Sequence, residues 1–404
     1  MSAALAGAAG RRAGEARPRE VANIAWALAR LQAGAPPVLP PLARVALASI
    51  HEFGAQELAN TAWAFAASSF VYIPFLRGLS VCPVDDFQPQ HLSNVAWSLA
   101  VQPFADGPFM AAIAARAMER ICDFDPQDLA STFWSFAKLA ISDEPLFNAL
   151  ATASMARLPD FPAQALSTTA WASATLQHMD APLLDAVARR AIARFASFRA
   201  QELANLTWAF ATFRWADGPL LMAIEAPAMM RLEAEEFRPQ ELASLAWSWA
   251  RLAPAGPRPL ARALAAAANR GLSHGRAAHW GAQELANVAS ACARLNVADG
   301  RTLSAVAGAL LGRMRAAEGG SSGAFGGVLA RHIEMVAWAL SRLDDLGPAE
   351  AFFACADAQG AAPGRLAVAG MLAEYERRGA PAPGGLERQL LLALAEPGAR
   401  VAAA

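Results

Sequence analysis

The sequence predicts an all-α fold, an α-solenoid of about nine helix-turn-helix repeats of roughly 37 residues with a degenerate C-terminal helical cap. Three observations predict it. One motif of 14 residues recurs along the chain, and its tryptophan returns at nearly constant spacing. The apolar residues in between keep the spacing of amphipathic helices, with no strand-like alternation.

The motif reads Phe-x-(Pro/Ala)-Gln-Glu-Leu-Ala-Asn-x-Ala-Trp-(Ala/Ser)-Phe-Ala, and its clearest copies span 53–66, 198–211 and 237–250. Successive anchor positions lie 37, 34, 37, 37, 37, 39, 43 and 48 residues apart, so the copies are units of one array. The anchors are Trp26, Trp63, Trp97, Trp134, Trp171, Trp208, Trp247, Ser290 (in the place of Trp) and Trp338.

Each unit is expected to hold two helices. Helix A opens at the Pro/Ala-Gln-Glu step, where proline loses no hydrogen bond and Glu complements the helix dipole. Helix B follows turns such as 106–108, 143–145 and 217–219, in which Asp and Gly suit the cap and Pro starts the helix. The second unit is short, and its helix B around 73–80 is weak.

A projection of helix A at about 100° per residue assigns its faces. Leu203, Leu206 and Phe210 form the face expected to pack on helix B. Small alanines at 204 and 211 allow the next repeat to approach closely. A polar stripe is predicted to hold Gln201, Asn205, Ala209 and Thr212, which in other copies reads Ser131, Ser135, Lys138 and Ser244, Ser248, Arg251.

Three regions are expected along the chain: a targeting or disordered segment at 1–17, the repeat array at 18–346, and the helical cap at 347–404. The first is rich in Ala and carries Arg11, Arg12 and Arg17, which is compatible with an organellar transit peptide. A Gly/Ser-rich insertion at 315–327 precedes the last unit. No segment is typical of a membrane span, so a soluble protein is expected.

Composition limits the kinds of partner. The formal net charge is −1 at pH 7, so a nucleic acid would be held by local basic patches. Lys138 is the sole lysine; the preference for Arg suits phosphate recognition, although GC-rich coding also explains it. Cys82, Cys122, Cys292 and Cys355 form no paired motif, which favours a reducing compartment without disulfides.

The Gln-Glu-Leu-Ala-Asn-x-x-Trp-Ala-Phe-Ala core at about 37 residues resembles the octotricopeptide repeat. It is also similar to the helical repeats of FAST-kinase-like proteins and of mitochondrial RNA-editing substrate-binding complex proteins, over residues 18–346. The resemblance implies organellar RNA binding, in transcript stabilisation, processing or translation, in a mitochondrion or chloroplast. Many such proteins end in a RAP domain; none is found here, so its nuclease-like activity is not implied.

Two rows of side chains on helix A are candidate RNA contacts. The tryptophan anchors could stack on bases, or could fill the seam between repeats. A polar row three residues before each anchor could hydrogen-bond base edges, and its variation is what a one-base-per-repeat code needs; alternatively it bonds a neighbouring backbone. This row is Asn23, Asn60, Asn94, Ser131, Thr168, Asn205, Ser244 and Asn287.

Two basic rows are candidate phosphate contacts. The first lies 23 residues after each anchor and comprises Arg120, Arg157, Arg194, Arg231, Arg270 and Arg313. These residues fall at the end of helix B, where an Arg can instead bond the last carbonyls and pair with an acid. The second lies four residues after the anchor and comprises Arg30, Lys138, Arg251, Arg294 and Arg342.

Nothing in the sequence indicates an enzyme. There is no phosphate-binding loop, nucleophile elbow or dinucleotide fingerprint, and His274 and His279 have no clustered partner for a metal. We therefore expect no cofactor, no metal and no small-molecule substrate. The predicted function is an organellar scaffold that binds single-stranded RNA, with possible protein partners in a ribonucleoprotein complex. The alternative is a protein-binding scaffold of the HEAT or armadillo kind.

Overall fold

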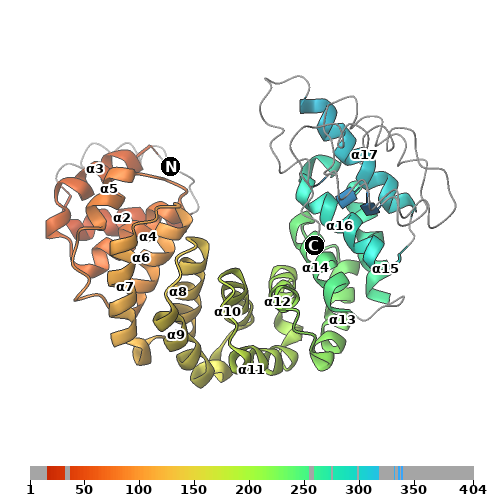
Figure 1. Cartoon of the computed structure of the whole chain (residues 1–404). Coiled ribbons are helices and arrows are strands. Elements are labelled where there is room, and N and C mark those ends of the chain that lie inside the picture. Colours follow the sequence, from red (N-terminus) through yellow and green to blue (C-terminus); the bar gives the residue numbers. More distant parts are fainter. Residues whose placement is uncertain are drawn as a thin grey trace, which may run out of the picture. The chain divides into compact units, whose positions relative to one another are not determined.

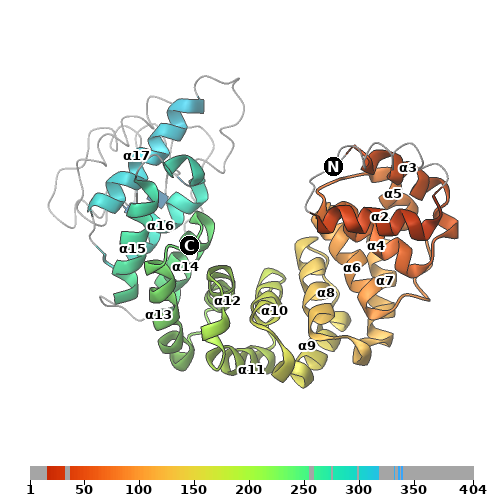
Figure 2. The ribbon, with the colours of Figure 1, turned by 180° about the vertical axis from the view of Figure 1, so that it is seen from behind.

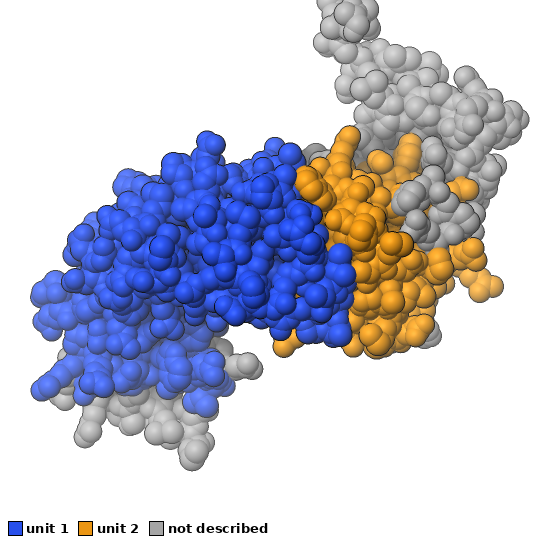
Figure 3. All heavy atoms as spheres, turned by 90° about the horizontal axis from the view of Figure 1, so that it is seen from below, with its two compact units in different colours: residues 1–197 blue, residues 198–404 orange. Residues whose placement is uncertain are grey.

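The computed structural model describes residues 16–31, 37–253, 259–273, 276–297 and 300–317, together with His332, Met335, Val336, Trp338 and Ala339. Over these residues the chain forms sixteen α-helices and no strand, which confirms the predicted class (Figure 1). The chain divides into two compact units, residues 1–197 and 198–404, coloured separately in Figure 3. The predicted segment 1–17 and cap 347–404 lie almost wholly outside the described residues.

Unit 1 contains five helix pairs. Its A helices are α2 (Pro18–Arg30), α4 (Ala55–Ala67), α6 (Pro89–Val101), α8 (Pro126–Lys138) and α10 (Ala163–Thr175). Its B helices are α3 (Leu39–Ala48), α5 (Ile73–Leu79), α7 (Gly107–Glu119), α9 (Glu144–Arg157) and α11 (Ala181–Ile192). Each A helix packs on the next, and Figure 2 shows the row from behind. The B helices form a second layer, so each helix pair contacts mainly the neighbouring pairs.

Unit 2 repeats this arrangement with three described pairs. Its A helices are α12 (Ala200–Thr212), α14 (Pro239–Leu252) and α16 (Ala282–Arg294), and α14 packs on both of the others. Its B helices are α13 (Gly218–Glu233), α15 (Pro259–Leu272) and α17 (Gly300–Ala317), with α15 between its two neighbours. Helix α17 includes the first residues of the predicted insertion at 315–327; the rest lies outside the described part.

The helices begin where the sequence predicts. Four A helices start with proline and the other four with alanine. In α12 and α14 the motif Glu accepts a hydrogen bond from the backbone N–H before the helix, at 2.7 and 2.9 Å. Four B helices are capped by an aspartate that accepts from an N–H three residues on: Asp106, Asp143, Asp180 and Asp217, at 2.9–3.0 Å.

Five A helices end in a left-handed turn that reverses the chain, although the residue at this turn is not glycine. The residue six positions after the anchor has a left-handed backbone, with φ of 53–55°. The following N–H bonds back to the fifth carbonyl before it, as in the Schellman motif. The residues are Ser69, Ala140, Gln177, Arg214 and Asn296. This turn directs the chain from helix A into helix B.

The core lies between the two layers. Leu203, Leu206 and Phe210 are completely buried, as the projection predicts, and Ala204 and Ala211 are buried on the flank. The second B helix, α5, is only seven residues long, which confirms that the second repeat of the array is short. It still buries Phe75, Leu76 and Leu79. No described helix is both long and apolar enough to cross a membrane.

One detail of the predicted polar stripe is wrong. Ala209, Ser135 and Ser248 are completely buried, because this side of helix A faces the packed interior and not solvent. Both serines turn their hydroxyls onto the carbonyl four residues earlier in their own helix, at 2.6 and 2.7 Å. The accessible stripe passes instead through the tryptophan one residue before them.

Candidate nucleic-acid interface

Each A helix presents one accessible stripe, which we call the A-face. In α14 it comprises Gln240 and Arg251, both exposed, and Ser244 and Trp247, both half-buried. These residues are separated by four, three and four positions, so a straight helix brings them to one side in successive turns. The opposite side of the same helix carries the buried Leu242, Leu245 and Trp249, so the A-face is free of the core.

The polar row occupies the middle of the A-face. Its members in α4 to α16 are half-buried and Asn23 is exposed. Asn287 accepts a hydrogen bond from Gln283 at 2.8 Å, and it is the one member whose side chain is bonded within the described part of the chain. The other amides and hydroxyls of this row therefore keep their donors and acceptors available on the accessible side.

The tryptophans lie one turn further along the same stripe. Trp26 is 46% exposed, and those of α4 to α14 are half-buried. Trp63 and Trp97, from neighbouring repeats, have ring centroids 6.4 Å apart with their planes inclined by 30°. Trp63 and Trp97 thus contact one another across the seam between two repeats, while part of each ring stays accessible.

The basic row four residues after the anchor completes the A-face. Arg30, Lys138, Arg251 and Arg294 are all exposed, and Arg342 lies outside the described residues. The Arg251 guanidinium lies 5.2 Å from the centroid of Trp247, and that of Arg30 lies 5.6 Å from Trp26. Arg294 lies 5.7 Å from Trp338 of the following repeat. Cation–π contact places these charges beside the aromatic rings.

Neighbouring guanidinium groups interact in unit 2. Partial burial lowers the pKa of Arg251, and the positive charges of Arg214 and Arg294 lower it further. Arg214 occupies the left-handed position after α12, and Arg294 ends α16. Three successive repeats therefore concentrate positive charge along one edge of the A-face.

The other arginine row lies in the B layer and contacts the protein itself. Arg194 donates to the Phe161 carbonyl, Arg270 to that of Leu232 and Arg313 to that of Ala278, at 3.0–3.1 Å. Leu232 lies in the last turn of α13, whereas Phe161 lies in the connection from α9 to α10 and Ala278 in that from α15 to α16. These bonds therefore tie each arginine to the end of the preceding B helix or to the connection that follows it.

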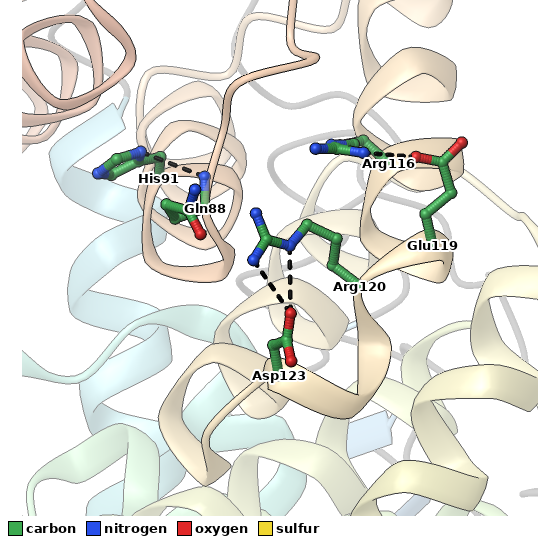
Figure 4. A network of polar contacts seen from close by, with 6 residues as sticks. All are labelled: Gln88, His91, Arg116, Glu119, Arg120 and Asp123. Atoms are coloured by element: carbon green, nitrogen blue, oxygen red, sulfur yellow. Dashed lines mark hydrogen bonds and ion pairs between the residues drawn. The ribbon is translucent and has the colours of Figure 1, made fainter.

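The remaining members differ in their surroundings. Arg120 pairs with Asp123 at 3.0 Å (Figure 4). Arg231, 8% exposed, donates to the Pro227 carbonyl of its own helix and pairs with Glu236. Arg157 is half-buried at the end of α9. These contacts support the carbonyl-bonding and acid-pairing role for this row.

Two features of the A-face are not among the candidate contacts predicted from the sequence, although Gln201 belongs to the predicted polar stripe. Arg214 was not recognised because it lies outside the regular basic row. A row of glutamines, seven residues before each anchor, is exposed in all seven repeats from α4 to α16. The signal was present, because this residue never varies among these copies while the exposed positions around it do. The row is Gln56, Gln90, Gln127, Gln164, Gln201, Gln240 and Gln283.

No group of three or more His, Cys, Asp or Glu side chains comes together among the described residues. A cavity of about 280 Å³ lies in unit 2, between the end of α13, the start of α14, α15 and the segment before α16, and is lined mainly by apolar groups including Phe237 and Trp280. Arg270 and Glu235, 3.5 Å apart, lie at its wall. The cavity belongs to the B-layer side and is separate from the A-face.

Residues 109–256 match the family of the RNA-editing substrate-binding complex 6 protein. The matched segment runs from α7 to the end of α14, so it covers A-faces in both units. The chain is similar to this family over that segment, in agreement with one of the resemblances of the repeat motif. No curated protein matches the chain.

Proposed function

We propose that this protein is a non-catalytic scaffold of mitochondrial RNA processing that holds single-stranded RNA on its A-faces. One observation carries the proposal: polar and aromatic side chains recur on the same accessible stripe of successive A helices, and basic side chains join them on α2, α8, α14 and α16. Each component suits one part of a nucleotide. Amides and hydroxyls bond base edges, indole rings stack on bases, and guanidinium groups bind phosphate.

The similarity to the RNA-editing substrate-binding complex 6 family supports this proposal and its location. The name of that family describes a component of a complex that binds substrates for RNA editing. By extension we propose that this chain works in a mitochondrion with protein partners in a ribonucleoprotein assembly. Its contribution is to hold or present a strand and not to break a bond.

The primary test is binding of the purified full chain to a random single-stranded RNA pool at 50 and 200 mM salt, with duplex DNA of equal length as control. We expect selective RNA binding that weakens with salt, because phosphate contacts release counterions. Sequences enriched from the pool would then reveal whether individual repeats distinguish bases. Absence of RNA binding at low salt, with the chain shown to be folded by circular dichroism, would refute the proposal and favour the alternative of a protein-binding scaffold.

A second arm tests whether the A-face is the surface involved. Arg30→Gln removes an exposed charge that lies over Trp26. Arg77→Gln serves as a matched control, since Arg77 lies on the B helix α5. We expect the first change to weaken RNA binding and the second to leave it unaltered. Equal effects would mean that the RNA is held by general charge and not by the A-face.

A further inference from the structure

We propose that Arg214, Arg251 and Arg294 of unit 2 form a phosphate-binding row that anchors the RNA backbone and supplies most of the salt-dependent affinity of the chain. This inference rests on the proposed function and deepens it. It assigns the electrostatic part of binding to one unit, and it adds Arg214, which follows no repeated pattern in the sequence.

The first support is the placement of the three side chains. Arg214 follows α12, Arg251 lies in the last turn of α14, and Arg294 ends α16. These A helices pack in consecutive order, so the three charges lie along one edge of adjacent repeats. All three side chains are exposed. Within the described part of unit 2, none of them forms an ion pair with an acidic side chain.

The backbone gives no reason for arginine at position 214. Its φ of 55° lies in the left-handed region, which is unfavourable for an L-residue with a side chain and favours Gly or Asn. Equivalent positions hold Ser69, Ala140 and Asn296, so the turn forms without a charge. The side chain also adds a third positive charge near Arg251 and Arg294, which repel one another. A guanidinium at this place therefore serves an external partner.

The contacts of Arg251 and Arg294 fit phosphate better than carboxylate. Each guanidinium lies beside a tryptophan ring, at 5.2 and 5.7 Å from the ring centroid. A guanidinium group beside a ring keeps its N–H donors, and two of them can bind two phosphate oxygens at once. A nucleotide brings both a phosphate for the edge and a base for the aromatic ring, whereas an acidic peptide brings no comparable stacking group.

Unit 1 lacks an equivalent row. The position four residues after its anchors holds Arg30 and Lys138 at nonadjacent repeats, with uncharged Ala67, Val101 and Thr175 at the others. Thr175 bonds back to the carbonyl of Trp171 at 2.9 Å, so it is satisfied within its own helix. The A-face of unit 1 therefore contributes mainly polar and aromatic contacts, with single charges at Arg30 and Lys138, and unit 2 contributes the main backbone anchor.

The test is the salt dependence of binding by the full chain, measured with uridine, cytidine and adenosine homopolymers of one length. The triple variant Arg214→Gln/Arg251→Gln/Arg294→Gln removes three charges from the row. The control Arg199→Gln/Arg238→Gln/Arg262→Gln removes three exposed charges of unit 2 from outside it. Equal melting temperatures would establish that both variants are folded.

For the row variant we expect the slope of log affinity against log salt to become shallower by about 2, since each phosphate contact on a single strand contributes about 0.7. The loss of affinity should be the same for all three homopolymers, because phosphate contacts carry no sequence information. The control should keep the slope of the unaltered protein. If the unaltered protein binds RNA and both variants change its slope equally, or neither does, the row is refuted while the proposed function stands. If the unaltered protein binds no RNA, the proposed function and the phosphate-binding row are both refuted.

Discussion

The Ser93 hydroxyl donates a hydrogen bond to Asp128 Oδ1 at 2.6 Å, which joins α6 to α8 in the interior of unit 1. The two side chains are 2% and 8% exposed. Asp128 occupies the place of the motif Glu, which in α12 and α14 caps the backbone N–H before the helix. In α8 the residue before the helix is itself the cap: Asp125 accepts from the Asp128 N–H at 2.8 Å, and the Asp128 side chain bonds the preceding repeat.

This contact predicts a pH-dependent stability. Burial raises the pKa of the Asp128 carboxyl, and the hydrogen bond from Ser93 opposes that rise. An acid with a raised pKa in the folded chain is harder to ionise when folded. Its ionisation therefore lowers the free energy of unfolding, with no effect below the unfolded pKa and full effect above the folded pKa. Ser93 limits the cost of the ionised form.

We expect Ser93→Ala to lower the free energy of unfolding by about 1.5–3 kcal/mol at neutral pH, since it removes a bond to a buried charge. The loss should shrink as the pH falls and Asp128 becomes protonated. Denaturant unfolding at several pH values would measure it. In an Asp128→Asn background the same substitution should cost less. A loss independent of pH in both backgrounds would show that the serine acts through packing alone.

The B-layer arginines are predicted to act on stability and not on RNA binding. Arg194→Gln breaks a partly buried bond to the Phe161 carbonyl, so we expect a loss of about 1–3 kcal/mol in unfolding free energy. Arg120→Gln removes a pair with exposed Asp123 and should cost no more than about 0.5 kcal/mol. Thermal unfolding and RNA affinity should be measured together. A variant that keeps its stability but binds RNA more weakly would identify its arginine as a phosphate contact.

The left-handed turn after α8 predicts a stabilising substitution. Ala140→Gly removes about 1–2 kcal/mol of backbone strain from the folded chain. It also destabilises the folded chain by about 0.5–1 kcal/mol, because glycine has more conformational freedom when unfolded. We expect a net gain of about 1 kcal/mol in denaturant unfolding. The same exchange at exposed Ala115, within α7, should lose about 1 kcal/mol. Opposite signs at the two sites would be the diagnostic result; a loss at both would contradict the role of the turn.

The polar row predicts that exchanging two of its side chains between repeats changes the base preference for RNA, while the amino-acid composition of the chain stays the same. Asn205→Ser combined with Ser244→Asn exchanges the side chains of two neighbouring repeats. We expect the base preferences at two sites of the bound strand to exchange as well, each by about 1 kcal/mol or more, because amide and hydroxyl groups bond different base edges. Selection from a random RNA pool would measure both. Identical enriched sequences for the double variant and the unaltered protein would assign the row to a structural role.

The glutamine row predicts an uncharged contribution to affinity. The triple variant Gln164→Ala/Gln201→Ala/Gln240→Ala removes exposed amides that make no hydrogen bond to the described residues. We expect RNA binding to weaken roughly a hundredfold if all three amides bond RNA, at about 1 kcal/mol for each lost bond. The slope against salt should not change, because no charge is lost, and the melting temperature should be preserved. An unaltered affinity would leave the glutamines without a role in RNA binding.

The sequence by itself determined the fold class, the helix pairs and most helix boundaries. Local interactions decide these features. Proline and the capping Asp and Glu mark each start within a few residues, and the apolar spacing places Leu203, Leu206 and Phe210 in the core. In a repeat array these local interactions predict more of the fold, because each repeat contacts mainly its neighbours and the same helix pair recurs along the chain.

Only the tertiary structure decided which side of each A helix is accessible. Ala209 and Trp208 are neighbours in the sequence, yet the alanine is buried and the indole is partly accessible, because packing against other helices covers one side and not the other. The same packing separates two arginine rows that look alike in the sequence. One bonds backbone carbonyls of the B helices and of the connections that follow them, and the other lies exposed beside tryptophan. It also brings Arg214 near Arg251 across 37 residues of sequence, a proximity that no local pattern encodes.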